Sequence, residues 1–410
     1  MPIDLQPDPD FLAPAVDRSA DAKWVLNFGP QHPATHTTIH LMLQLDGEVV
    51  TGCVPHIGYL HSGFEKQGEV LNWNQYVVIT DRMNYISPVA NNMAWHHAAE
   101  KLFGIDVPPR CKYIRSLMCE LARIFDHLLC VGAVSLDVGA FTGFTWAFEE
   151  RETINDLFEL ACGQRFHTSY SRLGGLMYDL PDEFWPLLDR LLDRLPRILG
   201  DFEGLLTRNR IFIERTKGIG EIGTERAINW ALSGPVARAS GVRRDLRKDE
   251  PYFAYPELDF KVPVADGGDC YARFLVRMEE IRQSTALLHQ IKEQIPAGPV
   301  NVPLTFGVTL PPKEQVYGSI EGLIAHFELV MTNRGFRAPI GESYGANETA
   351  NGELGFYLVS DGKPCAYRAR CRPPSFVHLA VFPELIVGHQ ISDVVAVLGS
   401  LNIIAAELDR

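Results

Sequence analysis

Histidines gather in one stretch of this sequence, between Gly29 and Tyr85. Five of the chain's 13 histidines lie between His32 and His61, among prolines, glycines and aromatic residues. An imidazole, with a reference pKa near ~6.5, exchanges a proton at neutral pH, and several on short connections are typical of a functional site. A single histidine is more often a structural residue, so the cluster, rather than any one ring, predicts the site.

Short strands are expected to hold this stretch in place. Trp24–Phe28 has the composition of a strand, and Thr38–Leu45 and Val49–Val54 flank Asp46-Gly47, a strong hairpin signal. The segment Gly29–His36 is then the first connection of a small β unit. Its two prolines fix the backbone and stiffen the loop, so that it can hold an imidazole in one place.

Helical periodicity dominates the rest of the chain, with apolar residues at three- and four-residue spacing. The pattern predicts an α+β fold that is mainly α, with a central helical bundle and small β units at both ends. A second hairpin is expected from Leu354–Ser360 and Cys365–Arg370. The expected helices are Val70–Thr80, Tyr85–Phe103, Arg110–Leu136, Phe144–Cys162, Pro181–Leu206, Asp269–Ile295, Ser319–Met331 and Ser392–Leu401.

Changes in composition divide the chain into four expected segments. These are a flexible acidic N-terminal arm over 1–22, a β unit carrying the histidine loop over 23–66, a helical bundle domain over 67–300 and a mixed α/β domain over 301–410. Within the bundle, Pro235–Val264 is irregular and rich in Arg and Asp. It is expected to be a long surface excursion, either a solvated loop or one that docks a partner.

Charge and composition exclude several classes of protein. The formal net charge of −13 argues against a nucleic-acid groove. The acidic N-terminus has no apolar run and is not a signal peptide. The most apolar stretch, Leu128–Phe144, is interrupted by Asp137 and is too short to span a bilayer, so membrane attachment is expected only through partners. Eight cysteines without a CxxC pair predict free thiols and no zinc or iron–sulfur site.

One glycine motif invites a nucleotide-binding interpretation. Gly218–Gly223 matches GxGxxG, follows a possible short strand, Ile211–Ile213, and precedes a helix, Glu225–Leu232. A dinucleotide site also needs a second hydrophobic strand within a unit of ~30 residues. Here Ser233-Gly234-Pro235 ends the helix and an arginine-rich loop follows. A tight turn is therefore the better interpretation.

Five motifs carry a family resemblance: GPQHPATH at 29–36, VPHIGYLHSGFEK at 54–66, DRMNY at 81–85, GQRFH at 163–167 and ELDR at the C-terminus. From about Trp24 to Arg410 the chain resembles the 49 kDa subunit of respiratory complex I, a family related to the large subunits of nickel–iron hydrogenases. The resemblance implies a hydrogenase large-subunit-like fold. It also implies a peripheral-arm subunit of a proton-pumping NADH:quinone oxidoreductase.

The relation to hydrogenases allows the sequence to be checked for the ligands of a metal centre. A hydrogenase large subunit holds its metals with two CxxC pairs, one near each end. The aligned positions here are Asn84, Ser87, Ile404 and Glu407, which cannot supply the soft thiolate ligands that such a centre needs. The resemblance therefore implies that this chain binds no metal or other cofactor of its own, and that the old metal cavity is reused for a quinone substrate.

Three residues match the quinone site of the family. The resemblance implies that the quinone head group lies between His36 and Tyr85, and that Asp137 pairs with His36. Two-electron reduction makes a dianion unless a proton arrives at each oxygen, so a donor at each end stabilises the developing charge and can supply the proton. Loss of the pairing between His36 and Asp137 after proton donation is expected to be the first event that couples quinone reduction to proton pumping. Asn84, and Asn402-Ile403, stand where the family has acidic residues.

Two further residues match positions that face an iron–sulfur cluster on the neighbouring subunit, Arg82 and His167. A cation there would raise the potential of the cluster, and an imidazole would make that potential pH-dependent. The resemblance implies three kinds of partner: the small iron–sulfur (B-type) subunit, the 30 kDa (C-type) subunit and membrane-arm subunits. It places the chain peripherally, on the cytoplasmic face of the inner (cell) membrane.

Two alternatives stay open on the sequence alone. One is a hydrogenase-like enzyme with a modified metal centre, which would need ligands other than the four missing cysteines. The other is a purely structural subunit that docks partners without chemistry. Spacing in sequence does not establish that His36, Tyr85 and Asp137 meet in space.

Overall fold

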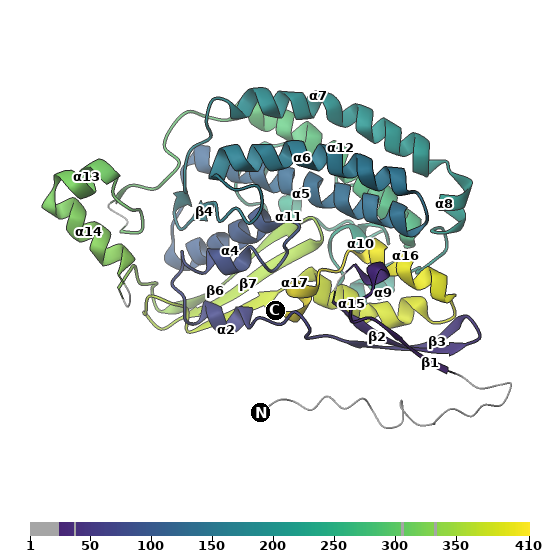
Figure 1. Ribbon diagram of the computed structural model, residues 1–410. Coiled ribbons are helices and arrows are strands. Elements are labelled where there is room, and N and C mark those ends of the chain that lie inside the picture. The colour runs from purple at the N-terminus through teal and green to yellow at the C-terminus, as the bar shows by residue number, and fades with distance from the viewer. Residues whose placement is uncertain (1–23, 37, 305–306, 332–333) are drawn as a thin grey trace.

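A computed structural model describes residues 24–36, 38–304, 307–331 and 334–410 (Figure 1). The expected N-terminal arm over 1–22 lies outside these residues. The described chain is an α+β fold, mainly α, with a helical bundle at its centre and small antiparallel sheets formed by residues near both ends, as the sequence predicts. In the described part of the chain, none of the helices is both long enough and apolar enough to cross a membrane.

The bundle is built around one long helix, α5 (Pro109–Asp137), which is buried along most of its length. It packs against α4 (Pro88–Phe103), α6 (Phe141–Cys162) and α12 (Cys270–Gln294), and α7 (Phe184–Phe202) lies on the outside against α6 (Figure 1). These five helices confirm the helices expected from apolar periodicity. The last residue of α5 is Asp137, so the central helix delivers that carboxylate to one end of the bundle.

The first sheet contains β1 (Trp24–Phe28), β2 (His40–Asp46) and β3 (Val49–His56), all antiparallel. It confirms the expected hairpin around Asp46-Gly47. The sheet packs against α15 (Pro374–Ile386), which in turn packs against α16 (Ile391–Leu401). The connection from β1 to β2 therefore runs close to the C-terminal helices.

The second sheet contains β6 (Gly341–Thr349), β7 (Gly352–Ser360) and β8 (Arg368–Arg372) and packs on α4. The pair β7–β8 confirms the expected second hairpin, whereas β6 was not predicted. A two-stranded ribbon joins β4 (Ser171–Arg172) to β5 (Gly175–Leu176). The shorter helical elements are η1 (Pro33–Thr35), α2 (Phe64–Gly68), α3 (Val77–Thr80), η2 (Glu203–Thr207), α8 (Arg210–Glu214), α9 (Thr224–Asn229), α10 (Gly234–Arg238), α11 (Leu246–Asp249), η3 (Tyr255–Glu257), α13 (Lys313–Gly318), α14 (Ile320–Val330) and α17 (Ala405–Asp409).

Two expected elements are wrong. The helix expected over Val70–Thr80 forms only at its end, as α3, because the Asn72 side chain accepts a hydrogen bond from the Gln75 N–H and makes a local turn instead. The possible strand at Ile211–Ile213 is part of the helix α8, which Asn209 caps. With no strand in front of it, the GxGxxG segment lacks the context of a dinucleotide site.

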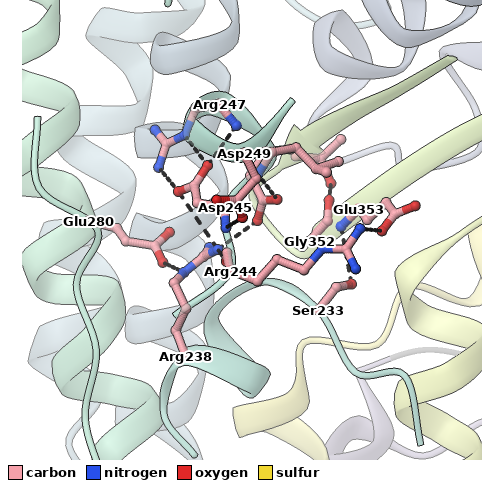
Figure 2. Close-up of polar contacts among 12 residues, drawn as sticks. Ser233, Arg238, Arg244, Asp245, Arg247, Asp249, Glu280, Gly352 and Glu353 are labelled. Atoms are coloured by element: carbon pink, nitrogen blue, oxygen red, sulfur yellow. Dashed lines mark hydrogen bonds and ion pairs between the residues drawn. The ribbon is translucent and has the colours of Figure 1, made fainter. Parts of the chain in front are cut away.

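The expected surface excursion over Pro235–Val264 is wrong in part. Arg238, Asp245 and Arg247 are buried, whereas Arg243, Arg244 and residues 248–250 are exposed. Arg238 donates to Glu280 and Glu348, both at 2.8 Å. Arg247 donates to Asp245 at 2.6 Å and also pairs with Glu120. Figure 2 shows the segment folded so that Arg238 meets Glu280 while Arg247 meets Asp245. Buried charges persist when they are paired in this way.

Candidate functional site

A cavity of about 260 Å³ opens where the end of the bundle meets the first sheet and the C-terminal helices. Its wall is mostly apolar, with a few polar groups, which is typical of a small-molecule site. The lining residues are Thr35, His36, Tyr85, Ile86, Leu129, Cys130, Ala133, Phe144, Leu398, Gly399, Asn402, Ile403 and Ile404.

His36 is fixed by the loop that carries it and by a carboxylate. Its backbone is left-handed, with φ of 53°, after the single turn η1, which packs against α16. Its Nε2 atom lies 2.7 Å from one carboxylate oxygen of Asp137 and 2.9 Å from the other. The Asp137 side chain is only 6% exposed, against 32% for His36. Burial raises the pKa of Asp137 above its ordinary value, and the His36 interaction opposes that rise.

Tyr85 lines the same cavity as His36. Both residues also line an adjoining, more open hollow of about 580 Å³, so they lie where the two spaces meet. The segment carrying Tyr85 is held by its neighbour Asn84, whose buried side-chain oxygen accepts hydrogen bonds from the N–H groups of Ile86 and Ser87. The structure thus brings together His36, Tyr85 and Asp137. The Asn84 side chain binds the backbone next to Tyr85.

Asn402 is a polar residue of the wall that the sequence analysis noted only as a departure from the family. It has a left-handed backbone with φ of 53° after α16. Its amide nitrogen donates to Asp126 Oδ1 at 2.6 Å and to Asn351 Oδ1 at 2.5 Å. Both amide hydrogens are therefore committed, and the amide oxygen is the part left for a molecule in the cavity.

Arg82 and His167 do not line the cavity but lie close enough for the charge of Arg82 to act on the His167 ring. Arg82 is exposed and donates to the Val78 carbonyl at 2.6 Å. The pKa of His167 is lowered by burial and then by the charge of Arg82. Asp81, next to Arg82 in the chain, accepts hydrogen bonds from the Ser169 N–H and hydroxyl, and burial raises its pKa to about 7.

The two segments that align with the hydrogenase cysteines meet at the cavity. Tyr85 and Ile86 come from the first segment and Ile404 from the second. In the described ranges no three His, Cys, Asp or Glu side chains are grouped so that they could hold a metal ion. All eight cysteines are free, as predicted, and burial raises the pKa of the wall residue Cys130 to about 11.

Comparisons with known proteins agree with one another. A family model described as "Respiratory-chain NADH dehydrogenase, 49 Kd subunit" matches residues 137–410. The chain is 45% identical over 409 residues to the D-type subunit of NADH-quinone oxidoreductase from Myxococcus xanthus, covering 98% of each chain. It is 47% identical over 386 residues to the second D-type subunit of the same oxidoreductase from Sinorhizobium medicae, covering 94% of this chain and 95% of that one. Identity to the D-type subunit from Geotalea uraniireducens is 45% over 385 residues, 94% of this chain and 98% of the relative.

Proposed function

The chain belongs to the family of 49 kDa (D-type) subunits of NADH-quinone oxidoreductase, and on that premise we propose that its cavity is the place where quinone is reduced. The observation that carries the proposal is that His36 and Tyr85 line one largely apolar cavity and that Asp137 pairs with the ring of His36. A quinone ring is apolar with a carbonyl at each end, so an apolar wall with two proton donors suits it. The chain itself holds no flavin, metal or cluster in this proposal.

The contact with Asp137 determines which atom of His36 acts on the substrate. Because Nε2 faces the carboxylate, Nδ1 is the ring nitrogen available to a quinone oxygen. An imidazolium, stabilised by the negative charge of Asp137, donates its Nδ1 proton to that oxygen as electrons arrive. The ring is then neutral and keeps only a hydrogen bond to Asp137. The weakened pairing is the step that we propose to be coupled to proton pumping.

Tyr85 supplies the second proton and Asn402 a third polar contact. The Tyr85 hydroxyl donates to the other quinone oxygen and is reprotonated from outside the cavity. The amide oxygen of Asn402, held by its bonds to Asp126 and Asn351, accepts a hydrogen bond from a hydroxyl of the reduced ring. This acceptor favours the quinol over the quinone.

Electrons reach the cavity from a cluster on the small iron–sulfur (B-type) subunit. The aromatic residues Phe141 and Phe148, near the cavity residue Phe144 at the start of α6, are exposed and offer an apolar surface for that subunit. Arg82 and His167 face its cluster. The 30 kDa (C-type) and membrane-arm subunits complete the contacts that hold the chain on the cytoplasmic face of the membrane.

The test is made on membranes carrying Tyr85→Phe or His36→Ala. NADH oxidation by quinone should fall by about 10²-fold or more, the usual contribution of a positioned proton donor. NADH oxidation by ferricyanide, which takes electrons upstream, should not change. Tyr178→Phe and His289→Ala, at exposed positions away from the cavity, are matched controls. Quinone reduction that survives both cavity variants would favour a purely structural subunit instead.

A further inference from the structure

Helix α14 carries a stripe of large apolar side chains that nothing in the described chain covers. The stripe consists of Ile320, Leu323, Ile324, Phe327 and Val330, which are 69%, 41%, 52%, 52% and 52% exposed. Their spacing of three and four residues places them on one face of the helix. Figure 1 shows α13 and α14 as a hairpin that stands away from the rest of the molecule. An exposed apolar patch of this kind marks an interaction surface.

The stripe does not serve the hairpin's own packing. The only buried residue of α14 is Gly322, where an added Cβ would lie 2.3 Å from the Gln315 carbonyl oxygen of α13. At 100° per residue, Phe327 is about 140° around the helix from Gly322. Close contact with α13 therefore uses one face of α14, and the apolar stripe occupies the other.

We propose that this stripe docks into an apolar groove, rimmed by basic side chains, on a neighbouring subunit of the same oxidoreductase. The proposal rests on the family membership of the chain but not on the chemistry of the cavity. Its charge argument comes from Glu321 and Glu328, which are seven residues apart and follow one edge of the stripe. Residues 313–330 contain these two glutamates, Glu314 and a single lysine, Lys313. Arg334 lies 3.9 Å from Glu328 and offsets part of that charge.

The same charges argue against two other occupants. Amphipathic helices that lie on membranes carry Lys and Arg on their polar face, because lipid headgroups are often anionic, and α14 has neither. A second copy of this chain would bring the same patch to both sides of a two-fold contact. The acidic edges would then oppose each other without complementary charge. A different subunit, with an apolar groove rimmed by basic residues, would complement both the apolar stripe and its acidic edge.

Crosslinking in the intact complex tests which molecule occupies the stripe. A photoreactive phenylalanine analogue in place of Phe327 should crosslink to another subunit of the complex, at a peptide that combines apolar and basic residues. The same analogue in place of His326, which is about 100° around α14 from Phe327 and within about 40° of Gly322, should crosslink within the chain. A crosslink from position 327 to a second copy of this chain, to lipid or to nothing would overturn the proposal.

Variants test whether the contact holds the complex together. The double variant Ile324→Glu with Phe327→Glu should lose the crosslinked subunit from the purified complex at a salt concentration at least twofold lower than the wild type. Glu321→Lys with Glu328→Lys should act in the same direction through charge. Ile211→Glu, a 65% exposed apolar position on α8, is the matched control. Wild-type retention by both double variants would contradict the proposal, whatever the outcome for Tyr85→Phe.

Discussion

His36 and Asp137, which are 101 residues apart in the chain, meet through one ring nitrogen and both carboxylate oxygens, at 2.7 and 2.9 Å. The loop after β1 supplies the imidazole and the end of the central helix α5 supplies the carboxylate. Because Asp137 is almost fully buried, its charge is poorly solvated and its main partner is the imidazole. The pair therefore links the first sheet to the bundle at the cavity wall.

Asp137→Asn should change how quinone reduction depends on pH. The carboxylate is charged above its pKa, which burial raises, so the charged pair is lost as pH falls through that value. The wild type should lose activity on the acid side at a higher pH than an ordinary aspartate would give, whereas Asp137→Asn should lack this limb. Its rate should be about 10- to 100-fold lower throughout, as for carboxylates that orient functional histidines. An unchanged acid limb in the variant would assign that limb to another group.

Gly399→Ala should disturb the pairing of His36 with Asp137. An added Cβ would lie 2.8 Å from Asp137 Oδ2 and 3.4 Å from Val134 Cγ2, so the carboxylate must move. The helix itself should tolerate alanine, which is favoured over glycine by about 1 kcal/mol. We expect quinone reduction to fall several-fold with ferricyanide reduction unchanged. The control is Gly200→Ala on α7, where a Cβ meets nothing within 4 Å; equal quinone rates in the two variants would contradict the account.

Asn402→Gly should weaken binding of the quinol product more than binding of quinone. Glycine accepts the left-handed backbone of this position and removes only the amide. Loss of one hydrogen bond to the quinol, worth about 0.5–1.5 kcal/mol, should weaken inhibition by quinol by about two- to tenfold and leave KM for quinone unchanged. Steady-state kinetics at several quinol concentrations measure both. Unchanged product inhibition would show that the amide oxygen does not contact the ring.

Arg82→Gln should alter the pH dependence of the neighbouring cluster. The charge of Arg82 lowers the pKa of His167, after burial, so its removal should raise that pKa. The range in which the cluster potential changes with pH should then move to higher pH, and the potential should fall. Redox titrations followed by EPR at several pH values measure this, with Arg82→Lys as the control that keeps the charge. If the redox potential of the cluster is the same in both variants as in the wild type, Arg82 does not lie near the cluster.

The sequence predicts elements whose signals are local and misses those that depend on distant partners. Asp46-Gly47 between alternating strands is enough to define the first hairpin, and apolar periodicity is enough for α5. The strand β6 is not predicted because its sequence, GESYGANET, contains Gly, Asn and Glu, which are rare in strands. It forms by pairing with β7. Arg238 reads as a surface residue until Glu280 and Glu348 are brought to it.

In the candidate site, too, local sequence signals are predictable and contacts between distant residues are not. The cluster of histidines signals a functional loop, and the family motifs identify His36, Tyr85 and Asp137. Only the fold brings His36 and Tyr85 to one cavity and Asp137 to His36. Asn402 has no motif of its own. Its orientation depends on Asp126 in α5 and on Asn351 in the turn between β6 and β7, and both lie far from it in sequence.

Photoaffinity labelling of the intact complex with a light-activated quinone analogue tests the central claim most directly. The account predicts labels on the peptides that contain Tyr85–Ile86, Leu129–Ala133 or Leu398–Ile404, removed by excess quinone and reduced in Tyr85→Phe. Labels confined to other subunits or to other peptides of this chain, still displaced by quinone, would place quinone reduction elsewhere and contradict the account.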